Sequence, residues 1–234
     1  MSRIVSESLG AAVWRAGLAD PQLHWKRGAS AWELAISWES RRSSDSGLPV
    51  EVERTLNAHA AFRSPRLLVA IVEHSVVLDD PRRPSQSDLW GILLTEAGHV
   101  SMSVEGKAGE EFDRRLGMWL KDQSKGKVAR LRFLCDQLAI PVQPADSLRY
   151  QLFHRAAAAV LEARRWRLPM ALMLVQSLAE SRTSWQDYAD FAQLLDLKAQ
   201  RQSVIGPRDA CGVPLYLAWV DSPKAPDHVA ASAV

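Results

Sequence analysis

The segment SDLWGILLTEAGHVSMSVEGK, residues 87–107, decides the fold that we predict for this chain. Its runs Leu89–Thr95 and Val100–Lys107 have the apolar and β-branched content of strands. Ala97-Gly98 separates the two runs and indicates a tight turn. We therefore predict an antiparallel β-hairpin, with an acidic residue, Asp88, just before its first strand.

The second strand of this hairpin alternates apolar and polar side chains. Because successive side chains of a strand point to opposite faces, its polar face carries, in order, Ser101, Ser103, Glu105 and Lys107. A carboxylate and an ammonium group therefore end the strand side by side. We expect both groups to be exposed in a cleft.

The register of the hairpin decides whether Asp88 joins them. A two-residue Ala97-Gly98 turn pairs Glu96 with His99 and sets Asp88 opposite Lys107, on the same face. A three-residue turn would move Asp88 to the opposite face. The sequence favours the first register, although alanine is a poor residue for the positive φ of a type I′ turn.

Periodicity and capping signals predict the other elements. Ser30 and Glu33 form a capping box, which places a helix at Ser30–Ser40. Further helices are predicted at Pro49–Phe62, Lys127–Ala139, Ser147–Trp166 and Ser184–Leu195. Further strands are predicted at Arg66–Val72, Met170–Leu178 and Val213–Val220, and a turn-rich loop at Asp79–Asp88.

Helices on both sides of a central hairpin predict an α/β fold, a three-layer α/β/α arrangement with a central mixed sheet. We expect residues 1–220 to form a single α/β domain. The Pro/Ala-rich residues 221–234 predict a flexible C-terminal tail.

Composition narrows the classes of function. The 234 residues carry a net charge of +2, which permits a nucleic-acid partner without requiring one. Two distant cysteines and six histidines without ligand spacing argue against structural zinc. No phosphate-binding glycine loop and no serine-hydrolase motif is present. The N-terminus has no signal-peptide core and the longest apolar run, Leu168–Val175, is too short to cross a bilayer, so we expect a cytoplasmic protein without a membrane partner.

The polar end of the hairpin has the groups that phosphodiester hydrolysis needs. Two carboxylates, here Asp88 and Glu105, supply the oxygen ligands that a hard divalent cation prefers, and the Gly106 carbonyl adds a further candidate ligand. The cation neutralises the scissile phosphate and lowers the pKa of a bound water. Lys107 would orient that water or stabilise the developing charge. The alternative without catalysis is a surface strand in which Glu105 and Lys107 pair with charges on the neighbouring strand.

These motifs resemble the PD-(D/E)XK nuclease superfamily, in which an acidic residue on one strand precedes (D/E)-x-K on the next. Asp88 and Glu105-Gly106-Lys107 match that pattern. The resemblance implies a restriction-endonuclease-like fold, catalytic roles for Asp88, Glu105 and Lys107, and a Mg²⁺ (or Mn²⁺) cofactor. Gly106 departs from the usual apolar middle residue, and glycine weakens a strand.

The same resemblance extends to residues on helices. Glu33 resembles the upstream glutamate of many members, although a capping role alone would explain a glutamate at this position. Tyr150 and Gln151 are similar in placement to an accessory tyrosine or glutamine. On sequence alone, Gln151 shares a polar line with Arg155 and Glu162, which favours a solvated face.

The chain also resembles, over most of its length, a bacterial domain family of unknown function. The resemblance is carried by the stretches HWKRGASAWELAISWE, RPSQSD, VEGK and LRYQLFHR. No activity follows from it.

Basic residues flank the acidic motif on both sides and are candidates for contacts with a phosphate backbone. They are Arg82, Arg83, Lys125, Lys127 and Arg130. A solvated loop and helix face would explain them as well. We therefore predict a metal-dependent phosphodiesterase acting on nucleic acid, expected to be DNA. The alternative is a non-catalytic α/β binding module, and the nine tryptophans are compatible with a homodimer under either reading.

Overall fold

A computed structural model describes residues 4–5, 10–18, 20–178 and 182–224. One mixed sheet runs through it, with strand order β1-β2-β3-β4-β5-β7-β6. Its strands are β1 (Ile4–Val5), β2 (Arg66–Val76), β3 (Ser85–Thr95), β4 (Gly98–Lys107), β5 (Met170–Ser177), β6 (Ser203–Ala210) and β7 (Val213–Asp221). Strands β2, β3 and β4 form an antiparallel meander, and β5 runs parallel to both β4 and β7.

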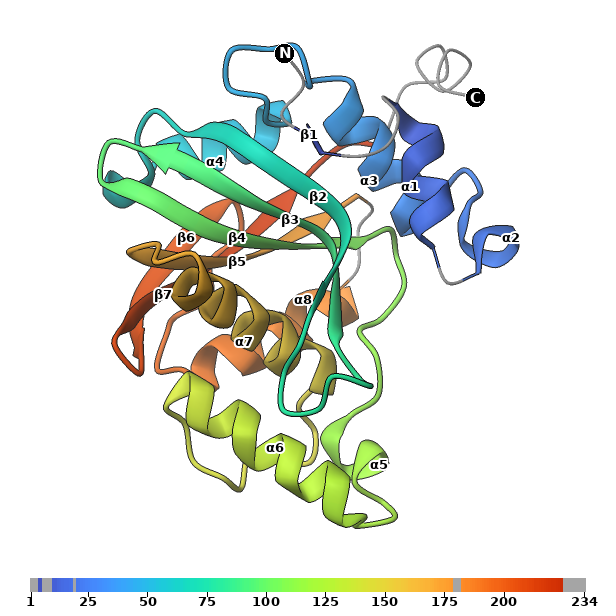
Figure 1. The fold of residues 1–234 in the computed structure, drawn as a ribbon, viewed down its shortest axis with the longest axis vertical. Coiled ribbons are helices and arrows are strands. Elements are labelled where there is room, and N and C mark those ends of the chain that lie inside the picture. Colours follow the sequence, from blue (N-terminus) through green and yellow to red (C-terminus); the bar gives the residue numbers. More distant parts are fainter. Residues whose placement is uncertain (1–3, 6–9, 19, 179–181, 225–234) are drawn as a thin grey trace.

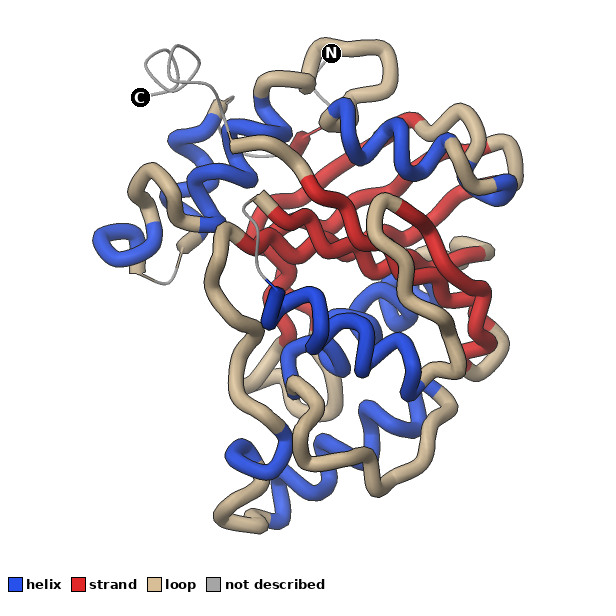
Figure 2. Tube along the Cα trace, turned by 180° about the vertical axis from the view of Figure 1, so that it is seen from behind, coloured by secondary structure: helices blue, strands red, loops and turns tan. Residues whose placement is uncertain are grey.

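Helices cover both faces of this sheet, which confirms the predicted three-layer α/β/α fold (Figures 1 and 2). One layer holds α1 (Ala11–Gly17), α2 (Pro21–His24), α3 (Ser30–Glu39), α4 (Val50–Asn57) and the short 3₁₀ turn η1 (Ala60–Phe62). The other holds α5 (Leu116–Trp119), α6 (Lys125–Leu138), α7 (Tyr150–Arg165) and α8 (Arg182–Leu194). Within the described residues, no helix is long and apolar enough to cross a membrane.

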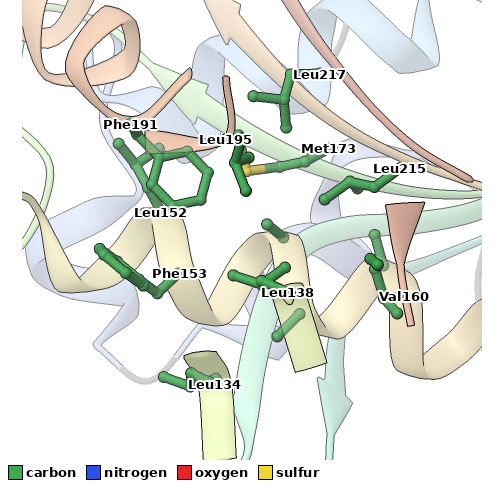
Figure 3. Packing of buried hydrophobic residues seen from close by; sticks show 14 of the residues in the cluster. Leu134, Leu138, Leu152, Phe153, Val160, Met173, Phe191, Leu195, Leu215 and Leu217 are labelled. Atoms are coloured by element: carbon green, nitrogen blue, oxygen red, sulfur yellow. The ribbon is translucent and has the colours of Figure 1, made fainter. Parts of the chain in front are cut away.

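The central position of β5 follows from its sequence, MALMLVQS, in which every residue is buried. A strand covered on both faces needs such a run, because neither face meets water. On one face, Met173 lies among Leu152, Val160 and Phe191 from α7 and α8 (Figure 3). Four consecutive alanines of α7, residues 156–159, are fully buried and let the helix approach the sheet closely.

The hairpin forms as predicted, but its register differs by two positions. Thr95 pairs with Gly98 and Trp90 with Ser103, so the turn residues are Glu96 and Ala97. Neither of them has a positive φ; Gly98 adopts φ 127° instead, as the first residue of β4. The fold thereby avoids the positive φ that the predicted turn would have forced on Ala97.

The predicted loop Asp79–Asp88 is wrong at its end, because β3 already begins at Ser85. Ser85 pairs with Val76 of β2, a strand that runs four residues further than predicted and so supplies the partner. Strand β6 was not predicted, since its Gly206-Pro207 reads as a breaker; as an edge strand it tolerates the proline. Of the predicted tail, Asp221 ends β7, and residues 225–234 lie outside the described part of the chain.

A kink in β2 lies beside the candidate site. Val72 pairs with Leu89 and His74 with Ser87, and Glu73 between them has φ 51°. Val72 packs into the core on the α3 side, whereas His74 lies 3.4 Å from Glu162 of α7, on the other side of the sheet. The left-handed Glu73 therefore breaks the alternation of side chains at the level of Asp88.

Candidate active site

Asp88 is held directly against the motif strand. The β3–β4 pairing ends at Leu89–Val104, and beyond it the Asp88 carboxylate accepts a hydrogen bond from the Gly106 backbone N–H at 2.8 Å. The side chain thus replaces a backbone acceptor of the ladder. This contact brings Asp88 beside Glu105 and Lys107.

Glu105 lies at the centre of the cluster and makes strong contacts through both oxygens. Its Oε1 accepts from Lys107 Nζ at 2.8 Å and from Gln151 Nε2 at 2.7 Å. Its Oε2 accepts from Arg155 Nε at 2.5 Å. Glu105 and Lys107 are 3% and 5% exposed, so the expectation that both are exposed in a cleft is wrong. Helix α7 covers this face of the sheet and shields the two side chains from water.

Lys107 is oriented by three different groups. Besides Glu105, its Nζ contacts Gln151 Oε1 at 3.3 Å and lies 4.9 Å from the centre of the Phe112 ring. Gln151 is itself fixed, because its Oε1 also accepts from the Asp113 N–H at 3.0 Å. Gln151 therefore belongs to the same cluster as Glu105 and Lys107, and its accessory role stays a prediction. Tyr150, the other candidate, stacks on Trp119 instead, with ring centres 4.0 Å apart.

The polar line of α7 does not face solvent as predicted. Arg155 is 7% exposed and Glu162 is 1% exposed, and both side chains turn toward the sheet. Arg155 reaches Glu105, donates to Ser85 Oγ at 3.2 Å and has Nη2 3.9 Å from Asp88 Oδ1. The single guanidinium therefore lies between the two predicted metal-ligand carboxylates.

Glu73 is a third acidic residue near the site, which the sequence analysis missed. Burial raises its pKa to about 8, and the Asp88 carboxylate adds to the rise. Its side chain lies against the end of α1, since a Cβ built on Gly17 would be 2.9 Å from Glu73 Cγ. No regular strand pattern marks Glu73, because its position depends on the left-handed kink.

Asp88 and Glu105 have opposite pKa shifts. Burial and the neighbouring Glu105 carboxylate raise the pKa of Asp88 to about 7. Burial also acts to raise the pKa of Glu105, but the charges and hydrogen bonds of Arg155 and Lys107 outweigh it and lower that pKa to about 2. Burial opposes the charge of Lys107, yet Glu105 and Asp88 raise its pKa, so it stays cationic at neutral pH. Of these two carboxyl groups, Asp88 therefore gains more from an added cation.

The donor set fits a hard cation through the side chains of Asp88 and Glu105, which offer carboxylate oxygens near one another. Gly106, the third candidate ligand, sits in the β4–β5 ladder opposite Gln176. Among the described residues, no group of three or more His, Cys, Asp or Glu side chains could hold a metal ion. A bound cation would therefore depend on two carboxylates, and it would compete with Arg155 for them.

Glu33 belongs to α3, which packs on the opposite face of the sheet from Glu105. A Cβ on Gly106 would be 3.2 Å from Leu34 Cδ2. The glycine at the centre of the E-x-K motif therefore leaves room for α3 to pack closely on β4. Glu33 is buried and accepts from the Gly28 N–H at 3.0 Å. The predicted capping box is wrong, because the N-cap residue is Ala29, which has no side chain to cap the helix, and Ser30 is already the first residue of α3.

Four of the five predicted nucleic-acid contacts gather at one pocket. Arg82, Arg83, Lys127 and Arg130 line it, together with Tyr150. Lys125, the first residue of α6, is exposed but does not line this pocket. Loop 79–83 and the start of α6, which lie far apart in the sequence, therefore form one basic surface beside the acidic cluster.

Comparison with curated proteins finds no match to this chain, and neither does comparison with solved structures. A family described as a domain of unknown function (DUF6946) matches residues 7–224. This range includes every residue of the candidate site and all strands from β2 to β7. The chain therefore belongs to that family of domains of unknown function.

Proposed function

We propose that this protein is a metal-dependent phosphodiesterase that cleaves nucleic acid, and we expect DNA to be the substrate. The observation that supports it most is the convergence of Asp88, Glu105 and Lys107, from two neighbouring strands, on one point of the sheet. The motif alone occurs by chance in many proteins; its convergence with Gln151 and Arg155 is a much more specific arrangement. The resemblance to PD-(D/E)XK nucleases supplies the reaction class.

In this proposal, Asp88 and Glu105 are the metal ligands. A bound Mg²⁺ or Mn²⁺ would neutralise charge on the scissile phosphate and acidify a water molecule. Lys107 stays protonated, because Glu105 and Asp88 raise its pKa. It therefore acts as a cation that stabilises developing negative charge and not as a general base. Gln151 holds both Glu105 and Lys107 and so fixes their geometry.

A second candidate function, the non-catalytic binding module, also has an observation in its favour. Glu105 is 3% exposed and each of its oxygens already accepts from a cationic or amide donor. Such a saturated network holds a fold together without needing a metal. Under this alternative the basic pocket would bind a partner without turnover.

Cleavage assays with the full chain separate the two functions. Labelled single- and double-stranded DNA and RNA are incubated with Mg²⁺, with Mn²⁺ and with EDTA, using the wild type and Lys107→Met. We expect cleavage with either metal, none in EDTA, and a loss of about 10²-fold or more in Lys107→Met, as for removal of a transition-state charge donor. The matched control is Lys198→Met, which removes a similar charge from an exposed position away from the site.

Full activity in EDTA, or unchanged cleavage by Lys107→Met, would exclude the proposed mechanism. Binding of nucleic acid without cleavage under all metal conditions would favour the binding module. Circular dichroism and a thermal melt of each variant show whether a loss of cleavage comes from unfolding of the protein.

A further inference from the structure

The pocket lined by the basic residues is a built feature of the fold with a volume of about 590 Å³. It lies between the loop at residues 79–83 and the first turn of α6, and the Trp119–Tyr150 stack forms part of its wall. Its charged lining residues are Asp79, Asp80, Arg82, Arg83, Lys127 and Arg130, so cations outnumber carboxylates by four to two. The charged side chains that line the pocket therefore carry a net positive charge.

The start of α6 offers this pocket free backbone donors. Ser124 is the N-cap residue, and its side chain makes no capping hydrogen bond. The first N–H groups of a helix have no acceptor within the helix, and the helix dipole adds positive potential there. A Cβ built on Gly126 would meet nothing within 4 Å, so an approaching group has access to this part of the turn.

Arg130 contributes a guanidinium group to the pocket, and one of its donors has no partner among the described residues. Its side chain is 8% exposed, and Nε is paired with Asp79 at 2.7 Å. Its Nη2 is buried and has no hydrogen-bond partner among the residues that the structure describes. A buried donor on a charged group without an acceptor costs free energy, and guanidinium groups are matched in shape to phosphate oxygens.

Arg83 contributes a further positive charge to the pocket. Its side chain is exposed and makes no ion pair or hydrogen bond within the described part of the chain. Arg82 and Lys127, in contrast, pair with Asp80 and Asp122 on the surface. Arg83 can therefore turn to a ligand without breaking a contact.

The pocket adjoins the candidate active site along the first turn of α7. Tyr150 lines the pocket, and the next residue, Gln151, bonds both Glu105 and Lys107. We propose that this pocket binds one phosphate group of the nucleic-acid strand that is presented to Asp88, Glu105 and Lys107. The identity of the strand rests on the proposed nuclease function; the phosphate chemistry rests on the pocket itself.

Calorimetric titration in EDTA tests this without cleavage. The ligands are a single-stranded DNA 12-mer with a 5′-phosphate and, separately, inorganic phosphate. The main variant is the double substitution Arg83→Ala with Lys127→Ala, since both side chains reach the surface and their loss should leave the fold intact. Arg132→Ala is the control, an exposed arginine of α6 outside the pocket.

We expect the double variant to bind the 12-mer at least about tenfold more weakly. Its salt dependence should flatten by about 0.7 in log–log slope, because one phosphate of a single strand is no longer neutralised. Arg132→Ala should bind like the wild type. Inorganic phosphate should compete with the 12-mer for the wild type. Arg130→Lys, which keeps the charge but loses the fork of donors, should weaken binding while retaining a native melting curve.

Equal binding by the double variant and the wild type would overturn the inference. Binding of inorganic phosphate without any binding of the 12-mer would overturn the assignment to a nucleic-acid strand. The two proposals fail separately: a wild type that binds through the pocket but never cleaves removes the nuclease function alone. A wild type that cleaves, with a double variant that binds and cleaves equally well, removes the pocket alone.

Discussion

Arg155 lies between two carboxylates, with Nε 2.5 Å from Glu105 Oε2 and Nη2 3.9 Å from Asp88 Oδ1. These are the carboxylates that we propose as metal ligands. One guanidinium thus neutralises part of the charge that a divalent cation would neutralise when bound. We therefore expect a bound metal ion to compete with Arg155 for Glu105, and this competition leads to the first prediction.

Replacing Arg155 with Met should destabilise the metal-free protein by about 3–5 kcal/mol, because a buried charge loses its partner. Millimolar Mg²⁺ or Mn²⁺ should restore much of that loss, and should stabilise the variant more than the wild type. Thermal melts with and without metal measure this difference.

Arg164→Met is the control for this experiment. Arg164 lies on the same helix but bonds Gln137 and the Ala210 carbonyl, not carboxylates, so metal should not restore its stability. Equal metal effects in the two variants, or none in Arg155→Met, would argue against a metal site between Asp88 and Glu105.

The second prediction concerns pH. Asp88 and Glu73 have pKa values raised to about 7 and about 8 in the folded protein, above their usual values. Between about pH 5 and 8 the folded state therefore holds protons that the unfolded state has released. Stability in EDTA should consequently fall as pH rises through this window, by at most about 1.4 kcal/mol per pH unit for each group. Glu105, whose pKa is lowered to about 2, stays ionised and adds no slope here.

Urea unfolding at a series of pH values, with EDTA or with Mg²⁺, measures this effect. Mg²⁺ should reduce the dependence of the unfolding free energy on pH, since it replaces the proton at Asp88. Asp88→Asn should reduce the slope in EDTA and abolish the effect of Mg²⁺. A stability that rises with pH over this range would contradict the prediction.

The part of the site that lies on β4 was predictable from the sequence. The period of two residues in a strand places Glu105 and Lys107 on one face whatever the turn, and this explains why a register error of two positions did no harm. Arg155 was not predictable, because a polar line on a helix looks alike whether it faces water or a buried carboxylate. Only the position of α7 over the sheet decides between them.

The roles of two other residues, Glu73 and Gly106, could not be predicted from the sequence. Glu73 reaches the site through a single left-handed residue in β2, for which alternation gives no sign. Gly106 looked like a weakness of the motif strand. The structure shows instead that this glycine makes room for Leu34, a tertiary contact that no local pattern contains.

The third prediction tests that contact. Gly106→Ala would place a Cβ 3.2 Å from Leu34 Cδ2 and 3.4 Å from Leu34 Cβ, so α3 or β4 must shift. We expect a loss of about 1–3 kcal/mol in the free energy of unfolding, as for overpacking of a core. In the Leu34→Ala background, Gly106→Ala should lower the free energy of unfolding by clearly less, because the contact with the Leu34 side chain beyond Cβ is removed.

Gly126→Ala is the matched control, since a Cβ there meets nothing within 4 Å and the residue lies in a helix. It should be neutral or slightly stabilising. If Gly106→Ala were equally harmless, the close packing of α3 on the motif strand would not be the reason for the glycine.

The fourth prediction separates Glu33 from Glu105, which the resemblance to nucleases groups together. Glu33 holds the Gly28 N–H at the start of α3, on the far face of the sheet, whereas Glu105 contacts Lys107, Gln151 and Arg155. Glu33→Gln should therefore retain cleavage within about threefold, since an amide oxygen still accepts that hydrogen bond. Glu105→Gln removes a charged metal ligand and should lower cleavage by about 10²-fold or more. It also leaves Arg155 and Lys107 with a neutral partner, so its melting temperature should fall below that of the wild type. Single-turnover cleavage rates and melting curves of both variants, measured with Mg²⁺ in the same preparation series, check this. An equal loss of cleavage in the two variants, with both folded at the assay temperature, would place Glu33 in the catalytic machinery and mean that the β3–β4 cluster alone does not form the active site.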